Sequence, residues 1–184
     1  MRRIAALGLL FFLLCSSLGF GQTFLIVVKE IRDGEELSRP FASQEGMIAA
    51  MFDLGFVSFD TGLYAPSVDW EAEEFQEPLD IAQQGLAQYI LAAEVQSVTE
   101  KRTLGSESGI APSMDLKPEL KIDTSVHYYL LGVETAGVLG EGEMVLDNSS
   151  PEKQQFTYWQ FLFSVGGDIA ARGIELLERI APSR

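Results

Sequence analysis

The sequence contains few of the residues that catalytic and metal sites use. Its 184 residues include one cysteine, Cys15, and one histidine, His127. A Ser-His-acid triad needs a histidine that accepts the hydroxyl proton, and a transition-metal site needs several His or Cys ligands close together. Two tyrosines follow His127 in a stretch that we expect to be a strand, which favours a structural role. We therefore expect no catalytic residue, no metal site and no enzymatic activity.

Phosphate-binding glycine loops are missing as well, and we expect no cofactor. Neither GxGxxG nor GxxxxGK[ST] occurs. The stretch GSESG at 105–109 has Glu107 where a nucleophile elbow needs serine. The acidic run 71–80 could hold a hard cation, but it lacks the alternating acids and turn glycine of a calcium loop. Hydrolysis of a glycosidic bond uses a pair of carboxylates, and the sequence has many acids but no spacing that singles out two of them. An acid-dependent hydrolase of envelope polymers is therefore a distant alternative.

Basic residues are also scarce. Thirteen Lys and Arg stand against 27 Asp and Glu, so the formal net charge is -14. Nucleic acids and anionic lipid head groups are captured by clustered Lys and Arg. We therefore expect neither as a partner.

The N-terminus has the order of a secretory signal peptide: Arg2 and Arg3, an apolar stretch at 4–14, and small residues after it. About eleven apolar residues are too few for a spanning helix, which needs about twenty. We predict a cut after Gly21, a signal peptide at 1–21 and a single domain at 22–184 that is periplasmic or secreted. The alternative is a lipid anchor on Cys15, although Leu14 before it is larger than lipoprotein signals favour.

Hydrophobic periodicity predicts the first elements of this domain. The apolar run 24–28 reads as a buried strand. Residues 47 and 51, like residues 48 and 52, are apolar and four apart, which predicts a helix with one apolar face, Ser43 as its N-cap and Gly55 as its stop. A short strand at 56–57 follows.

The stretch IAQQGLAQYILAAEVQSV at 81–98 changes its period partway. Up to Gln88 the apolar spacing is helical, and from Tyr89 apolar residues alternate with others as in a strand. We interpret it as a helix that leads into a strand, with one continuous helix as the rival.

In the second half of the domain, two β-rich runs on either side of 134–137 predict a long hairpin. The helical spacing of Ile169, Gly173 and Leu176 predicts a terminal amphipathic helix. The element order is β-α-β-α-β-β-β-α. We predict an α/β fold with one mixed sheet packed with three helices.

Two long connections, at 61–77 and 102–118, separate these elements. Right-handed crossovers would make the first three strands parallel, so we expect both connections, and that at 147–155, to leave the same edge of the sheet. The first connection carries Tyr64, Trp70 and Phe75. These aromatic residues are either anchors for a protein partner or a satellite of the core.

Three short stretches resemble a family of bacterial envelope domains. They are Leu-Gly-Phe-Val at 54–57, Ala-Gln-Tyr-Ile-Leu-Ala-Ala-Glu-Val at 87–95, and Val-Glu-Thr-Ala-Gly at 133–137. The family includes the N-terminal domain of periplasmic TolB, the LpoB-type activators of penicillin-binding proteins, and the periplasmic part of the curli channel CsgG. The resemblance implies a non-catalytic domain that docks onto other envelope proteins, and it transfers no active-site residue.

We therefore expect an exported envelope accessory domain that acts by protein-protein association. The alternative is a periplasmic protein that binds a small ligand or a cation. The sequence names neither the partner nor the oligomeric state.

Overall fold

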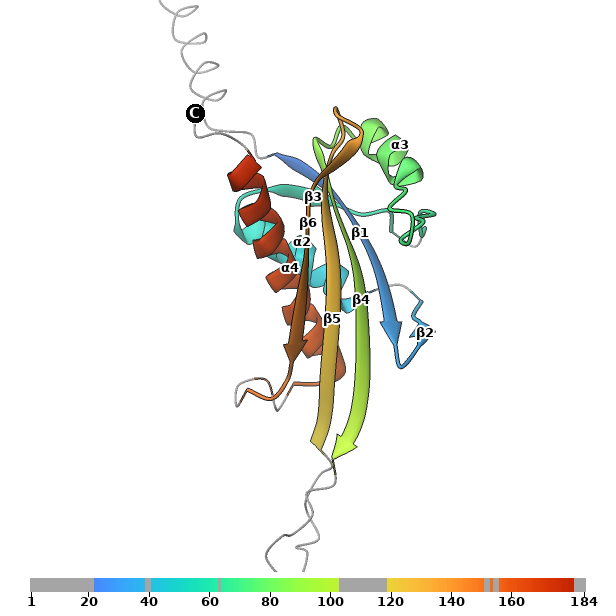
Figure 1. Cartoon of the computed structure of the whole chain (residues 1–184). Coiled ribbons are helices and arrows are strands. Elements are labelled where there is room, and N and C mark those ends of the chain that lie inside the picture. The colour runs from blue at the N-terminus through green and yellow to red at the C-terminus, as the bar shows by residue number, and fades with distance from the viewer. Residues whose placement is uncertain are drawn as a thin grey trace, which may run out of the picture.

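The computed structural model describes residues 22–38, 41–62, 64–102, 119–150, 153 and 156–180 (Figure 1). Its strands are β1 (Thr23–Arg32), β2 (Glu35–Glu36), β3 (Val57–Phe59), β4 (Tyr89–Arg102), β5 (Glu119–Gly132) and β6 (Gly137–Asp147). Its helices are α2 (Ala42–Asp53), α3 (Gln76–Gln84) and α4 (Tyr158–Ile180). The signal peptide at 1–21, its cut after Gly21, lipidation of Cys15 and the connection 103–118 lie outside the described residues. Those predictions remain untested, and so does the single domain at 22–184.

The strands form one mixed sheet in the order β2-β1-β4-β5-β6, and β3 also pairs with β1. The pairs β1-β3 and β1-β4 are parallel, whereas β4-β5 and β5-β6 are antiparallel. The predicted α/β class, with one mixed sheet and three helices, is confirmed. The two-residue strand β2 was not predicted, because both of its residues are exposed and no periodicity marks it.

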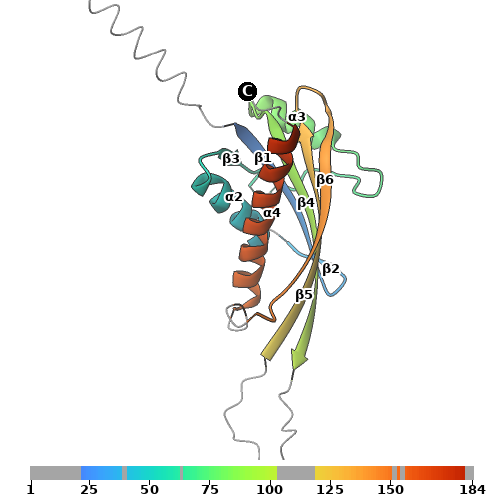
Figure 2. The ribbon, with the colours of Figure 1, turned by 60° about the vertical axis from the view of Figure 1, so that its left-hand side comes forward.

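The helices cover both faces of the sheet (Figures 1 and 2). Helices α2 and α4 pack on the first face, over a core that includes Phe24, Leu91 and Phe161. Helix α3 and part of the segment before it pack on the second face, over a smaller core. Among the helices of the described residues, none is long and apolar enough to cross a membrane.

Helices α2 and α4 cross at two glycines. A Cβ on Gly46 would lie 2.0 Å from the carbonyl oxygen of Phe163, and a Cβ on Gly166 would lie 2.0 Å from that of Ser43. Real Cβ atoms do not approach backbone this closely. Glycine at both positions therefore allows the two helices to pack with their backbones in contact.

The N-cap prediction for Ser43 is wrong. The N-cap position of α2 is Phe41, and Ser43 lies inside the first turn. Its backbone N-H and its hydroxyl both donate to Oε1 of Glu30, at 2.7 and 2.5 Å. Glu30 is only 2% exposed, and this burial raises the pKa of its carboxyl. Ser43 therefore serves a buried carboxylate on β1 rather than the end of its own helix.

The predicted stop at Gly55 is confirmed. Gly55 has a φ of 84°, its N-H donates to the carbonyl of Phe52, and the N-H of Phe56 donates to the carbonyl of Met51. This is a Schellman motif, in which glycine adopts the left-handed conformation without a steric cost.

The change of period in 81–98 is also confirmed. Helix α3 ends at Gln84, and β4 begins at Tyr89 and continues to Arg102. The helix is four residues shorter than the pattern predicted, and a continuous helix is excluded.

The first long connection does not leave the sheet at the end where β4 ends, so the expected common edge is wrong for it. Strand β3 ends at Phe59, which the register places level with Leu25 and Ile90, whereas β4 runs on to Arg102. The physical reason is the length of β3, because its three residues pair only with the beginning of β1. The described part of the first connection therefore leaves near the opposite end of the sheet and packs in part over the second face, through Val68 and Trp70.

Candidate functional site

Three turns meet at the end of the sheet where β1, β3 and β4 begin (upper end in Figure 1). The N-H of Gln88 donates to the carbonyl of Thr23 at 2.9 Å, and the N-H of Val133 donates to that of Gln88 at 3.0 Å. Val57 is the register partner of Thr23 on the other side. The stretch 54–57, the start of 87–95 and the stretch 133–137 are therefore neighbours in space. We call the surface formed by residues 52–57, 85–89 and 132–138 the turn end.

The turn end exposes large apolar side chains. Phe52 is 78% exposed, Leu54 52%, Val57 55% and Leu86 79%. Phe52 lies in the last turn of α2 beside the fully buried Met51, so it is on the side of the helix that the core does not cover. Exposed apolar patches on a soluble domain mark interaction surfaces.

Leu86 is also held in an unfavourable backbone conformation. It follows α3 in a Schellman motif like that of α2, with its own N-H on the carbonyl of Gln83 and the N-H of Ala87 on that of Ala82. Its φ of 56° is left-handed, which costs a residue with a Cβ roughly 1 to 2 kcal/mol. Packing against the described residues does not offset this free-energy cost, because most of the Leu86 side chain is exposed to solvent.

The neighbouring Gly85 is the C-cap of α3 and lies close to Phe59. A Cβ on Gly85 would lie 2.4 Å from the ring of Phe59, so glycine is needed at the C-cap for this close contact. The left-handed position one residue later, where α2 has Gly55, then falls to Leu86. The site thus presents an exposed apolar side chain in the turn after α3.

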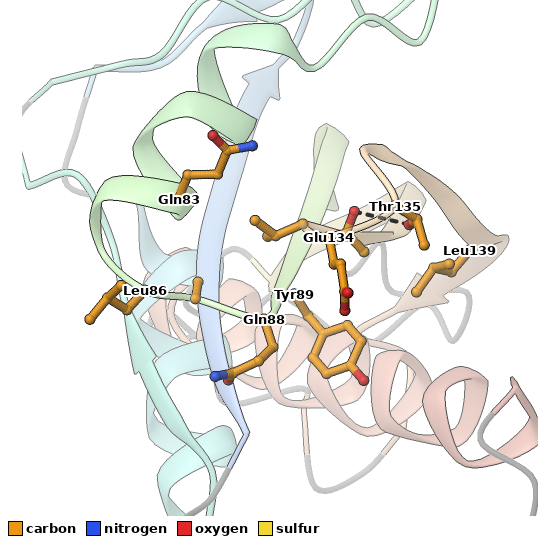
Figure 3. A pocket seen from close by; sticks show the side chains of 10 residues that line it. Gln83, Leu86, Gln88, Tyr89, Glu134, Thr135 and Leu139 are labelled. Atoms are coloured by element: carbon orange, nitrogen blue, oxygen red, sulfur yellow. Dashed lines mark hydrogen bonds between the residues drawn. The ribbon is translucent and has the colours of Figure 1, made fainter.

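A hollow of about 630 Å³ lies between the turn after α3 and the β5-β6 hairpin (Figure 3). Gln83, Leu86 and Tyr89 line one part of it, and Glu134 and Leu139 line another. It combines apolar surface with a few polar groups at its rim. Such a hollow can accept an apolar side chain of a partner or a small molecule.

The three aromatic residues predicted as partner anchors lie in different surroundings. Phe75 is 3% exposed, and its ring centroid is 5.8 Å from that of the half-buried Trp70 and 5.2 Å from that of Tyr129. Tyr64 is mainly exposed, and its hydroxyl donates to the carboxylate of Glu77. Phe75 thus belongs to the second core, and Tyr64 is the one open to solvent. A role in partner binding remains a prediction for all three.

The acidic run 71–80 is partly occupied in holding its own segment. Asp69 Oδ1 accepts from the N-H groups of Glu71 and Ala72, and Glu77 accepts from the hydroxyl of Tyr64 and the N-H of Ser67. These last two bonds lower the pKa of Glu77. Within the described ranges, no three His, Cys, Asp or Glu side chains are grouped to hold a metal ion.

His127 lies half-exposed on the second face of the sheet. Its Nδ1 is 3.1 Å from the hydroxyl of Tyr129, and its Nε2 is 4.0 Å from Glu141 Oε2. Both neighbours are residues of β5 and β6 that keep the ring on the sheet surface.

The fold and the turn end define an α/β domain with an exposed apolar end, and comparison with known proteins adds a likeness in fold. No family model and no curated protein matches the chain. The PelC dodecamer from Paraburkholderia phytofirmans is 12% identical, with a TM-score of 0.44 over 85% of this chain and 86% of that one. TolB from Acinetobacter baumannii is 13% identical, with a TM-score of 0.47 over 85% of this chain and 28% of that one.

The C-terminal domain of LpoB from Salmonella enterica is 13% identical, with a TM-score of 0.34 over 68% of this chain and 82% of that one. The resemblance to TolB and LpoB drawn from the three short stretches is therefore found again as a weak likeness in fold. At these identities the likeness assigns no activity and no partner.

Proposed function

We propose that this protein is an exported, non-catalytic accessory domain of the bacterial envelope that binds another protein through its turn end. The observation that carries the proposal is Leu86, which is 79% exposed and left-handed in a place where glycine would cost less. A strained and exposed apolar residue reduces the stability of the free domain. Such residues persist where the strain or the exposure serves a function. The predicted signal peptide supports export.

The apolar side chains of the turn end provide enough contact energy for specific binding. Full burial of one Leu, Val or Phe side chain contributes about 1.5 to 3 kcal/mol. Phe52, Leu54, Val57 and Leu86 are each more than half exposed, so a partner that covers the turn end would bury apolar area of these side chains. The hollow beside Leu86 offers a place for one apolar side chain of that partner. Binding energy concentrated in a few central side chains is the usual pattern at protein interfaces.

Polar substitutions at the turn end test this proposal. The interaction partner is the envelope protein that cross-linking of the wild-type protein in intact cells joins to it reproducibly. We expect Leu86→Asn and Leu54→Asn each to weaken that complex about tenfold, which corresponds to about 1.4 kcal/mol. The matched control is Val98→Asn, which replaces an exposed valine on β4 away from the turn end.

Stability separates loss of binding from loss of folding. Asparagine tolerates the left-handed conformation better than leucine, so Leu86→Asn should melt no lower than the wild-type protein. Unchanged affinity in both turn-end variants would refute the proposed surface. Turnover of an envelope polymer by the purified protein, abolished by a point substitution, would refute the non-catalytic role.

The hollow of about 630 Å³ favours one alternative, the binding of a small molecule. Its volume lies within the range of small-molecule sites, about 300 to 1,000 Å³. Native mass spectrometry of the protein purified from its host cells would show an added mass in the wild-type protein. Thr135→Trp, which places a large ring at the rim of the hollow, should remove that mass.

A further inference from the structure

Strand β6 forms one border of the sheet and has a free edge (Figure 2). The hydrogen bonds show which of its residues face outward. The N-H of Asn148 donates to the carbonyl of Ile122 at 3.2 Å, directly after the register pair Asp123-Asp147. Since bonding alternates along an antiparallel pair, Leu146, Met144 and Gly142 also bond to β5.

The backbone groups of the intervening residues, Glu141, Glu143, Val145 and Asp147, therefore point away from the sheet. The pairing of β5 with β4 gives the same result. The N-H of Val133 donates to the carbonyl of Gln88, so the odd-numbered residues of β5 bond to β4. In the regular part of the ladder, the even-numbered residues of β5 therefore bond to β6, and their register partners on β6 are also even-numbered. Within the described part of the chain, no strand pairs with these four outward-facing residues.

Of the usual protections of an exposed edge, β6 has acidic side chains but neither proline nor lysine. Natural edge strands are blunted by proline, lysine or a covering segment, because unpaired N-H and C=O groups accept another strand. The sequence from Gly137 to Asp147 contains neither proline nor lysine. Its one irregularity lies near the hairpin, between Leu130 and Leu131 on the partner strand. The ladder from Glu141 to Asp147 is regular.

The two sides of this edge differ in chemistry. Glu141, Glu143 and Asp147 are exposed and project on the second face, with Val145 at 81% exposure between them. The two lysines of β1 and β5 on that face are already paired with acids of the sheet. Lys29 lies 3.4 Å from Glu94, and Lys121 lies 2.6 Å from Asp123. The acids of β6 therefore leave a row of negative charge along the free edge.

The opposite side of β6 faces α4 and mixes apolar with charged side chains. Gly140 lies against the side chains of Leu176 and Ile180, and Gly142 lies over the ring of Tyr128. Met144 and Leu176 line a small hollow of about 190 Å³ between the strand and α4, together with Glu143, Arg172, Glu175 and Arg179. Both arginines are paired with Glu175, at 3.0 and 3.7 Å. The space beside the two glycines is filled by side chains of β5 and α4, so β6 itself adds little side-chain bulk on this side.

We propose that the β6 edge binds an extended cationic segment of another protein, which adds to the sheet as a further strand. Its Lys or Arg residues would lie opposite Glu141, Glu143 and Asp147, and its small apolar residues would lie on the side of α4. Strand addition of this kind takes affinity from the backbone bonds and specificity from alternate side chains. The proposal is independent of the turn end and adds a second surface to the domain.

A second copy of the chain is a poor occupant of the same edge. Two β6 strands related by a two-fold axis would pair antiparallel. If the two-fold axis passes through Glu143, this residue lies opposite Glu143 of the second copy. If the axis passes through Met144, Glu141 lies opposite Asp147 of the second copy. Like charges directly opposite one another destabilise a strand pair. The acids of β6 thus act against self-association while they favour a basic segment.

The probe for this proposal is a capped peptide of about nine residues that alternates lysine with valine, long enough to span the outward-facing residues. Its control alternates glutamate with valine. Amide hydrogen exchange and fluorescence anisotropy are measured on the purified protein. We expect the lysine peptide to slow exchange at Glu141, Glu143 and Val145, and the glutamate peptide to have no effect.

Two matched variants at one position separate strand addition from general attraction to an acidic surface. Val145→Pro removes an N-H that the native sheet does not use, so the fold should tolerate it. Val145→Thr keeps that N-H. We expect the proline variant to bind the lysine peptide about tenfold more weakly and the threonine variant to bind it like the wild type. Glu143→Lys keeps the backbone edge intact, and it should weaken binding to the same extent or more.

Equal affinity of the proline and threonine variants, with a native melting transition in both, would overturn the proposal. So would unchanged exchange at the three amides, or absence of peptide binding. Concentration-dependent dimerisation through β6 would show that the occupant is a second copy instead.

Discussion

Replacement of Gly166 by alanine tests the packing of α2 on α4, and we expect a net loss of about 2 kcal/mol. In a helix interior, alanine is favoured over glycine by about 1 kcal/mol. Against that gain, the new Cβ would lie 2.0 Å from the carbonyl oxygen of Ser43 and 2.8 Å from the N of Met47. Both are backbone atoms, so α2 must move away from α4. Overpacking costs about 1 to 3 kcal/mol, and a backbone contact this close belongs at the upper end.

The next residue provides a matched control. A Cβ on Gly167 would have its nearest neighbour, the Cβ of Ala50, at 4.0 Å. Gly167→Ala should therefore keep the helical gain and stabilise the protein by about 1 kcal/mol. The two variants should differ by about 3 kcal/mol, or roughly 6 to 12 °C in Tm for a domain of this size.

Thermal and urea unfolding followed by far-ultraviolet circular dichroism measure this difference. If both variants melt within about 2 °C of each other, α2 and α4 are not in backbone contact, and the packing of the first core described above is wrong.

Three further substitutions test other parts of the structure. Burial raises the pKa of Glu30 above its ordinary 4.5, so its proton stabilises the folded state and this stability is lost as pH rises from about 4.5 through the raised pKa. Glu30→Gln should remove that part of the pH dependence of Tm. Asn148→Ala deletes bonds to the N-H of Ile122 (2.9 Å) and the carbonyl of Leu120 (2.6 Å), so unfolding in urea should show a loss of about 2 to 3 kcal/mol. Trp70→Ala removes a half-buried ring from the second core, and Tm should fall by several degrees. An unchanged Tm would instead assign Trp70 to a partner surface.

Local periodicity was sufficient to predict the order of the main elements. The run 90–93 is continuously apolar and fully buried because both faces of this central strand are covered, and alternation begins only at Glu94. Gly55 could be predicted as a helix stop because its left-handed conformation is a local requirement. The chain gave no local sign of β2, whose two residues are exposed.

The errors came from contacts between distant parts of the chain. Serine is a favoured N-cap residue, but the hydroxyl of Ser43 donates a hydrogen bond to Glu30 on β1 instead. The prediction of a common edge was wrong for the first connection, because β3 pairs with β1 over only three residues. No spacing rule indicates either contact.

The turn end shows the same limit. The stretches 54–57, 87–95 and 133–137 resemble other envelope domains, and only the register of the sheet shows that they are neighbours in space. The left-handed conformation of Leu86 belongs to the Schellman motif that ends α3, and leucine is not a residue from which that conformation is predicted. Periodicity shows that Phe52 is apolar and four residues after another apolar residue, but it does not show which apolar side chains of α2 the core covers.

The central claim is that the turn end is a docking surface, and site-specific photo-cross-linking in intact cells tests it most directly. A photoreactive amino acid is placed at position 54 or 86 on the turn end, and at position 98 on β4 as the control. We predict that positions 54 and 86 join the protein to the same envelope protein, and that position 98 does not. Cross-links that are equally frequent at position 98, or absent from positions 54 and 86, would contradict the account.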